Sequence, residues 1–142
     1  MRLHKIFYAL NTISYVDKNK LLSLKKDLKA LDYFVVEVPG DKIHTARQYL
    51  NFMGKEFKMP DYAGFDAYSD WMTDLSWIPN HRIGVIIDDY ESFLNKDLRA
   101  KEIVTESFTD VILPFWEKDV IRIMVGGKPR IFEVYIVNNY FV

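Results

Sequence analysis

The chain has 142 residues, the commonest size for one globular domain and enough for a hydrophobic core that needs no metal or disulfide. Hydrophobic residues make up 49% and charged residues 27%, which excludes both a disordered chain and a membrane-embedded body. Cysteine is absent, so disulfides, thiolate catalysis and cysteine-ligated zinc are excluded. The net charge is −1, so electrostatic recognition has to come from local clusters of charge.

The first half of the chain predicts two strands, each followed by a helix. Residues 5–10 are apolar and aromatic, which is typical of a strand, and Asn11 and Thr12 follow as a turn. Leucines at helical spacing predict an amphipathic helix over residues 18–30. The apolar run at residues 33–38 predicts the second strand, and the helical period that begins near Thr45 predicts a helix that ends near residue 57.

The second half predicts a helix at residues 65–75 and a strand at residues 83–87. Residues 96–116 predict either one helix or two, in the second case with a break near Pro114. A last strand is predicted at residues 131–137. Strands that alternate with helices favour an α/β fold, in which a small parallel sheet of three to four strands is flanked by helices. No repeat or linker interrupts the sequence, so residues 1–142 are predicted to form a single domain.

Three aspartates lie at intervals of four residues in the predicted helix at 65–75. At this spacing Asp66, Asp70 and Asp74 share one helix face. Like charges so placed cost a helix roughly 0.2–0.5 kcal/mol per pair. Residues 65–78 contain no lysine or arginine that would relieve the repulsion. A helix selected for stability alone would avoid this pattern.

Two interpretations of the aspartates compete. In the first, Asp66 complements the helix dipole and the other two carboxylates are merely solvated. In the second they form a protein interface, which the aromatic residues in the same stretch favour because such residues bury large areas at low entropic cost. At least one of the two tryptophans of this stretch is nevertheless expected in the core. The aromatic residues are Tyr62, Tyr68, Trp71 and Trp77.

Acidic residues elsewhere in the sequence bear on the same question. Asp88, Asp89 and Glu91 follow the predicted strand at 83–87, and they add to the negative field of the helix if that strand ends nearby.

A catalytic metal site is the less favoured alternative. Three carboxylates suit magnesium, but magnesium ligands usually come from several elements around a cleft, whereas a regular ladder fits a flat surface better. The three histidines, His4, His44 and His81, show no metal-ligand spacing. We predict no catalytic residue, no metal site and no cofactor.

Location and nucleic-acid binding are also constrained. The N-terminus lacks the features of a secretory signal, and no apolar run approaches the roughly 20 residues that span a bilayer, so a cytoplasmic protein is expected. The lysines of the predicted helix at 18–30 are interpreted as a solvated face, not as a nucleic-acid site.

Residues 59–77 read Met-Pro-Asp-Tyr-Ala-Gly-Phe-Asp-Ala-Tyr-Ser-Asp-Trp-Met-Thr-Asp-Leu-Ser-Trp. This segment resembles the signature of the barstar family of ribonuclease inhibitors, which runs roughly Pro-x-Tyr-Phe-Gly, Asn-Trp-Asp-Ala-Leu, Asp-Cys-Leu, Asp-Leu and a tryptophan. The chain departs from the signature by two fewer residues between Gly64 and Asp66, by Ser69 in place of a tryptophan, and by Trp71 in place of the cysteine. The order of elements extends the resemblance over residues 33–137.

The resemblance implies a barstar-like fold and assigns roles to four residues. Asp70 matches the aspartate that enters the nuclease active site at a phosphate position, Asp66 matches a second acidic contact and Tyr62 an interface tyrosine. Glu117 matches a further acidic contact. The aspartate spacing and the aromatic setting add Asp74 and Trp71 to the predicted partner-binding residues. Residues 1–32 lie outside the family pattern and are predicted to add a strand and a helix as an N-terminal extension.

The expected function follows from these assignments. The chain is predicted to be a non-enzymatic, stoichiometric inhibitor, an antitoxin or immunity protein of bacterial competition, that binds one cognate ribonuclease toxin. A monomer that forms a 1:1 heterodimer is expected, with no nucleic acid or membrane as partner. The alternatives are a barstar-fold binding module for a DNase toxin or a host protein, and a magnesium-dependent hydrolase.

Overall fold

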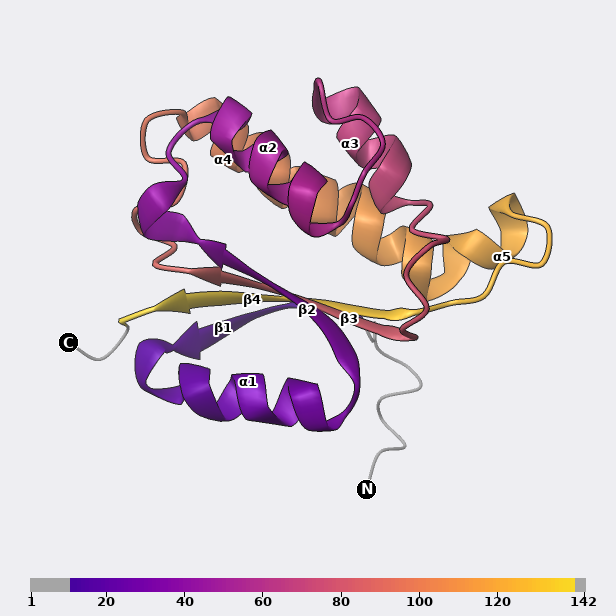
Figure 1. Cartoon of the computed structure of the whole chain (residues 1–142), viewed down its shortest axis with the longest axis horizontal. Coiled ribbons are helices and arrows are strands. Elements are labelled where there is room, and N and C mark those ends of the chain that lie inside the picture. The colour runs from indigo at the N-terminus through magenta and orange to yellow at the C-terminus, as the bar shows by residue number, and fades with distance from the viewer. Residues whose placement is uncertain (1–10, 140–142) are drawn as a thin grey trace.

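The computed structural model describes residues 11–139, and the strand predicted at residues 5–10 lies outside them. The described residues form one four-stranded sheet and helices on both of its faces, which confirms the predicted α/β class (Figure 1). The elements are β1 (Ile13–Asp17), α1 (Leu21–Ala30), β2 (Tyr33–Pro39), α2 (Ala46–Glu56), α3 (Phe65–Met72), β3 (Arg82–Asp88), α4 (Leu98–Glu106), α5 (Val120–Ile123) and β4 (Ile131–Asn138).

The sheet is parallel throughout and has the order β1-β4-β3-β2. β4, the last strand of the described residues, therefore lies between β1 and β3. Its register places Val134 beside Ile13 on one side and beside Val85 on the other. Parallel neighbours require crossovers, and the helices supply them.

The two faces of the sheet are covered unequally. α1 lies alone on one face, while α2, α3, α4 and α5 lie on the other (Figure 1). Strand residues alternate between the two sides, so Ile86 packs in the small cluster under α1, whereas Val85 and Ile87 pack in the large core. The large core thus supports the layer that contains α3.

The first strand differs from the prediction. β1 covers Ile13–Asp17, a stretch for which the sequence predicted no element, and Asn11 forms a bend two residues before it. The Asn11 side chain is buried; its Nδ2 donates to the carbonyls of Leu113 and Arg130, and its Oδ1 accepts the Phe132 N–H at 3.0 Å. Asparagine is common in turns, which is why a turn was predicted here, and its amide also bonds to distant backbone and aligns β1 with β4.

The segment around Pro114 remains helical without a break. Beyond α4 the helix widens into π-helical turns over Ser107–Ile112 and Phe115–Asp119 and then ends in α5. In these turns the N–H of Leu113 donates to the Phe108 carbonyl five residues earlier. A π turn displaces the carbonyl that a proline ring would otherwise meet, so the helix tolerates Pro114.

A buried chain of hydroxyls fixes α3 to its neighbours. The Tyr68 hydroxyl lies 2.7 Å from that of Tyr49 on α2 and 3.5 Å from that of Ser107, which donates to the Val104 carbonyl. Burial raises the pKa of Tyr68 to about 12 against the lowering effect of its hydrogen bonds, and burial also raises the pKa of Tyr49. Both phenols therefore stay neutral at ordinary pH and hold α3 against α2 and the end of α4.

Over residues 11–139, no helix combines the length and the apolar character that crossing a membrane requires.

Candidate functional site

The segment that leads into α3 is held by α2. Arg47 donates to the carbonyl of Tyr62 at 3.1 Å and to that of Ala63, and the Asp61 carboxylate accepts the Ala63 N–H at 3.0 Å. The ring of Tyr62 lies flat against the backbone of α2 at Gly54, where a Cβ would come within 2.2 Å of it. Only glycine allows this approach, so Gly54 and Arg47 together fix the half-buried Tyr62.

We expect Gly54→Ala to lower the free energy of unfolding by about 1 kcal/mol. Overpacking against the Tyr62 ring costs about 1–3 kcal/mol, and the better helix propensity of alanine offsets up to about 1 kcal/mol of that. In a chain that also carries Tyr62→Ala, the same substitution is expected to stabilise the fold, because the clash is gone. Urea denaturation of the four chains measures both effects, and the same sign in both backgrounds would contradict the proposed contact.

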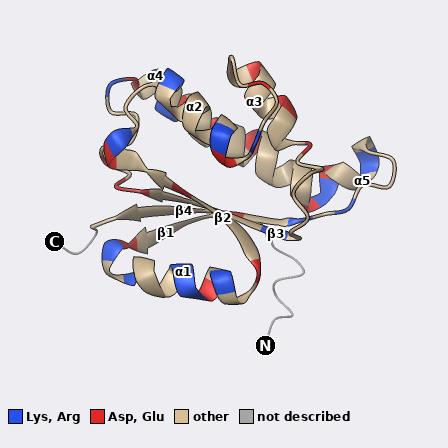
Figure 2. Cartoon of the chain, in the orientation of Figure 1, with Lys and Arg blue, Asp and Glu red and all other residues tan. Residues whose placement is uncertain are grey.

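α3 presents two of the predicted aspartates to solvent. Gly64 caps the helix, Asp66 lies in the first turn and Asp70 one turn later, and both aspartates are exposed. The opposite side of the helix buries Tyr68 and Met72 completely. The two carboxylates therefore share one face, about 6 Å apart along the axis, and α3 carries no lysine or arginine (Figure 2).

The third aspartate is not on the helix, and in this the prediction is wrong. α3 ends at Met72, and Thr73 caps it with its hydroxyl bonded back to the Ser69 carbonyl at 2.9 Å. Leu75 then takes a left-handed conformation with φ of 48°, which a helix does not allow, while its side chain is fully buried in the core. Burial of Leu75 thus redirects the chain one turn earlier than the sequence pattern predicted.

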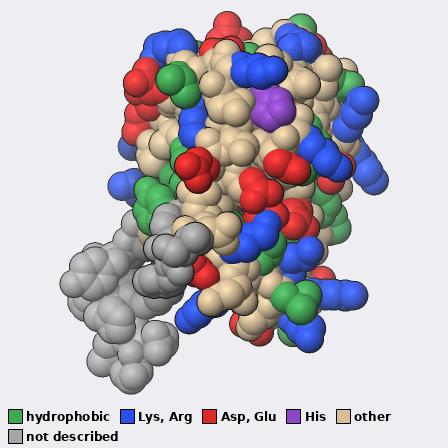
Figure 3. All heavy atoms as spheres, turned by 90° about the vertical axis from the view of Figure 1, so that its left-hand side faces the viewer, with side chains coloured by type: hydrophobic (Ala, Val, Ile, Leu, Met, Phe, Trp, Pro, Cys, Tyr) green, Lys and Arg blue, Asp and Glu red, His purple; other side chains and the backbone are tan. Residues whose placement is uncertain are grey.

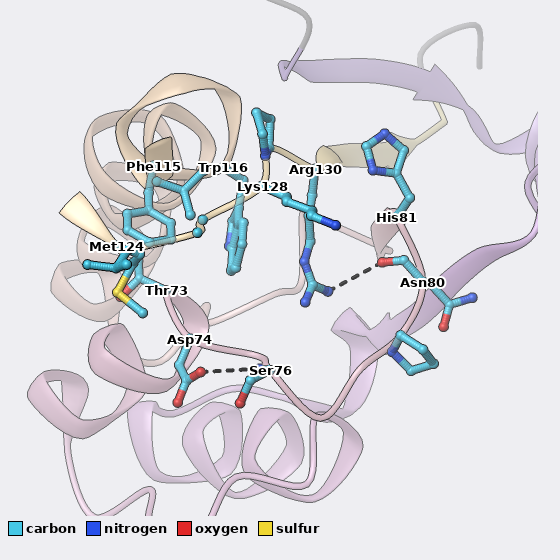
Figure 4. A pocket seen from close by; sticks show the side chains of 16 residues that line it. Thr73, Asp74, Ser76, Asn80, His81, Phe115, Trp116, Met124, Lys128 and Arg130 are labelled. Atoms are coloured by element: carbon cyan, nitrogen blue, oxygen red, sulfur yellow. Dashed lines mark hydrogen bonds between the residues drawn. The ribbon is translucent and has the colours of Figure 1, made fainter. Parts of the chain in front are cut away.

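Asp74 consequently lies beside a hollow and does not share the helix face of Asp66 and Asp70. Its carboxylate accepts the N–H of Ser76 at 3.2 Å, and it faces the half-buried Arg130 across the hollow (Figure 4). Burial lowers the pKa of the Arg130 guanidinium, and the charge of Asp74 opposes that effect. Asp74 is therefore placed to balance a cation, in contrast to Asp66 and Asp70.

Trp71 lies on the flank of α3. Its ring meets the ring of Trp77 edge-on at 5.8 Å between centroids, and it packs against the large core. Trp77 in turn donates its indole N–H to the Phe57 carbonyl at 2.8 Å. Both rings are partly buried against the core, so Trp71 and Trp77 use much of their aromatic surface to support α3 and leave less of it for an interface.

Glu117 lies apart from the aspartates of α3. Its carboxylate accepts the backbone N–H of Asn11 at 3.0 Å, and it lines a second hollow that neither Asp66 nor Asp70 borders. The neighbouring Trp116 lines the other hollow, beside Asp74, and donates its indole N–H to the Met72 carbonyl at 2.9 Å. Glu117 therefore holds the start of β1, and its predicted contact with a partner stays a prediction.

The acidic residues after β3 do not join the field of α3. β3 has seven residues, so about 20 Å separates its start, near Asp74, from Asp88 at its end. Lys18 bonds Asp88 at 2.7 Å and Asp89 at 3.5 Å. Figure 3 faces the end of the sheet where the strands end, and acidic and basic side chains are interspersed there.

Within the part of the chain that the structure describes, no three histidine or acidic side chains are grouped so that they could hold a metal ion.

The fold and its surface define a small α/β protein whose distinctive chemistry is an acidic helix face beside an anchored aromatic loop. A family model described as Barstar (barnase inhibitor) matches residues 33–125. The chain therefore belongs to the Barstar family, whose members are inhibitors and not enzymes. The matched span contains α3 and every predicted partner-binding residue. The comparisons with curated proteins and with solved structures gave no match.

Proposed function

We propose that this chain is a stoichiometric inhibitor of a cytotoxic ribonuclease, an antitoxin or immunity protein that covers the active site of the nuclease with α3. The observation that carries the proposal is the exposed pair Asp66 and Asp70 on a helix without any basic residue. Membership of the Barstar family supports a ribonuclease as the partner.

The chemistry of a ribonuclease cleft explains why carboxylates would block it. Such a cleft collects basic side chains around the substrate phosphates, so two carboxylates on a rigid helix can take the place of the RNA backbone. The buried face of α3 makes the helix rigid, since Tyr68 and Met72 are fully buried and Tyr68 is hydrogen bonded to α2. A preorganised pair of anions loses little conformational entropy when it binds.

The remaining predicted residues take supporting roles in this proposal. Tyr62 lies three residues before α3 and Asp74 two residues after it, so we propose that they contact the partner on either side of the acidic face. Trp71 contributes the exposed edge of its ring, and Glu117 a more distant contact. In the same proposal residues 1–32 are an N-terminal extension of a single domain that acts in the cytoplasm and forms a 1:1 complex.

A DNase toxin is the second candidate partner. The chain departs from the family signature at the start of α3, where it is two residues shorter, and within α3, where Ser69 replaces a tryptophan. A DNase cleft also binds phosphates, so the same carboxylates would fit it, while a rebuilt loop would change which nuclease is accepted.

The test is a titration of nuclease activity. Barnase, the enzyme named in the family description, is the first probe. The second probe is a nuclease isolated from extracts of the source organism. It is a protein that binds to the immobilised chain but not to an immobilised chain that carries both Asp66→Ala and Asp70→Ala. We expect cleavage of a fluorogenic RNA to fall linearly and to reach its minimum at one chain per nuclease. Inhibition of DNA cleavage alone supports the DNase candidate, and undiminished cleavage by every probe at tenfold excess of the chain contradicts both.

A further inference from the structure

A hollow of about 420 Å³ adjoins the C-terminal end of α3 (Figure 4). The segment from Thr73 to Ser76 forms one side of it, and the turn after α5 forms the other. The rings of Phe115 and Trp116, packed edge-on at 4.8 Å, line its inner part, and both are nearly fully buried. The hollow thus adjoins the proposed interface and shares Asp74 with it, while its other lining residues are not among the predicted partner-binding residues.

One wall of the hollow carries basic groups that no acidic group pairs with directly. The guanidinium of Arg130 lies 4.6 Å above the Trp116 ring and donates to the carbonyls of Leu75 and Asn80, which are neutral. The ammonium of Lys128 reaches over the same wall (Figure 4). Among residues 11–139, no carboxylate lies within 4.0 Å of Arg130 or Lys128. Asp74 offsets only part of this positive charge.

The outer rim of the hollow is apolar. Met124 and Val125 follow α5, and their exposed fractions are 46% and 107%. Burial of these two exposed apolar side chains against a bound molecule would contribute favourable free energy. A ligand that suits this hollow therefore combines an apolar body with an anionic group.

We propose that the hollow is a second docking point for the nuclease, one that takes a carboxylate side chain which the nuclease carries next to an apolar residue. This inference rests on the proposed function. A partner that covers Asp70 extends over Thr73 and Asp74, which directly follow α3 and line the hollow. Arg130 and Lys128 then pair with the carboxylate, while Met124 and Val125 contact its apolar neighbour.

A carboxylate fits this site better than a phosphate does. The C-terminal end of α3 points to the hollow and contributes a negative partial charge, which disfavours a dianion. The surface therefore changes sign from acidic on α3 to basic beyond Asp74. Two contacts of opposite sign admit only one orientation of the partner, which gives the complex specificity.

The first test uses the chain alone and a blocked glutamate, N-acetyl-glutamate methylamide, with blocked glutamine as the matched neutral probe. We expect saturable NMR shifts of the Trp116 indole N–H and the Arg130 side chain with glutamate only. Lys128→Glu should abolish them, whereas Lys118→Glu, which reverses an exposed lysine outside the hollow, should not. Equal shifts with both probes, shifts that survive Lys128→Glu, or tighter binding of inorganic phosphate would each overturn the proposal.

The second test uses the nuclease found by the titration described above. Lys128→Glu is expected to weaken its binding roughly tenfold, as an unfavourable charge at an interface does, with no change in thermal stability because Lys128 is exposed. Binding that is lost with Asp66→Ala and Asp70→Ala but unchanged with Lys128→Glu refutes the second docking point and leaves the proposed function intact. Binding that none of the three substitutions alters refutes the proposed function itself.

Discussion

Replacement of Asp70 by alanine is expected to weaken the complex with the inhibited nuclease by about 30- to 5,000-fold, the effect of about 2–5 kcal/mol. The range is the usual cost of removing one partner of a buried charge pair at a protein interface, and measurements on the barnase–barstar complex contribute to it. The physical reason is that the substitution leaves the basic groups of the nuclease buried and unpaired, so most of the loss appears as faster dissociation.

The fold should not change with this substitution, because the Asp70 side chain is exposed and the buried side of α3 is untouched. Surface plasmon resonance gives the dissociation rates, and urea denaturation checks the stability. Asp27→Ala is the matched control, since Asp27 is an exposed helical aspartate on α1, across the sheet from α3. If Asp70→Ala and Asp27→Ala dissociate at the same rate, α3 does not contact the active site.

Replacement of Trp116 by alanine is expected to lower the free energy of unfolding by about 3–5 kcal/mol, which is the usual cost of deleting a buried indole. Trp116 is 4% exposed, donates to the Met72 carbonyl at the end of α3 and lies under the Arg130 guanidinium. The substitution thus removes a large apolar volume, a hydrogen bond and a cation–π contact together.

Trp116→Phe separates these contributions. Phenylalanine keeps most of the apolar volume and the aromatic face but leaves the Met72 carbonyl without its donor, so a loss of about 1–3 kcal/mol is expected. Urea denaturation of the three chains measures the series. A Trp116→Phe chain as unstable as Trp116→Ala would show that the hydrogen bond, and not packing, dominates at this position.

Patterns among residues close together in the sequence predicted well where the helices begin and that the sheet is parallel. Thr45 and Gln48 form a reciprocal capping box at the start of α2, and such a pair depends only on residues three apart in sequence. The strand at Tyr33–Pro39 was equally clear, because a run that is apolar on both faces suits the middle of a layered α/β fold. Both predictions could be made from a few consecutive residues of the sequence.

The errors arose where distant residues decide the outcome. The period of four placed Asp74 on the helix, but the core accepts the Leu75 side chain only if the chain turns first. No local signal predicted that the Asn11 side chain bonds to the backbone at Leu113 and Arg130. The hollow beside α3 had no sequence signal at all, because Arg130 and Asp74 meet only through the tertiary fold.

The position of β4 has a consequence for how the protein is made. β4 pairs with both β1 and β3, and the Asn11 to Phe132 bond that aligns it spans 121 positions of the sequence. Among the described strands β1 pairs only with β4, so during translation this pair forms only once β4 has left the ribosome, and contacts so distant in sequence form slowly. The four-stranded sheet therefore cannot form before β4 has been synthesised, and a nascent chain that stops before Ile131 lacks the strand that joins β1 to β3.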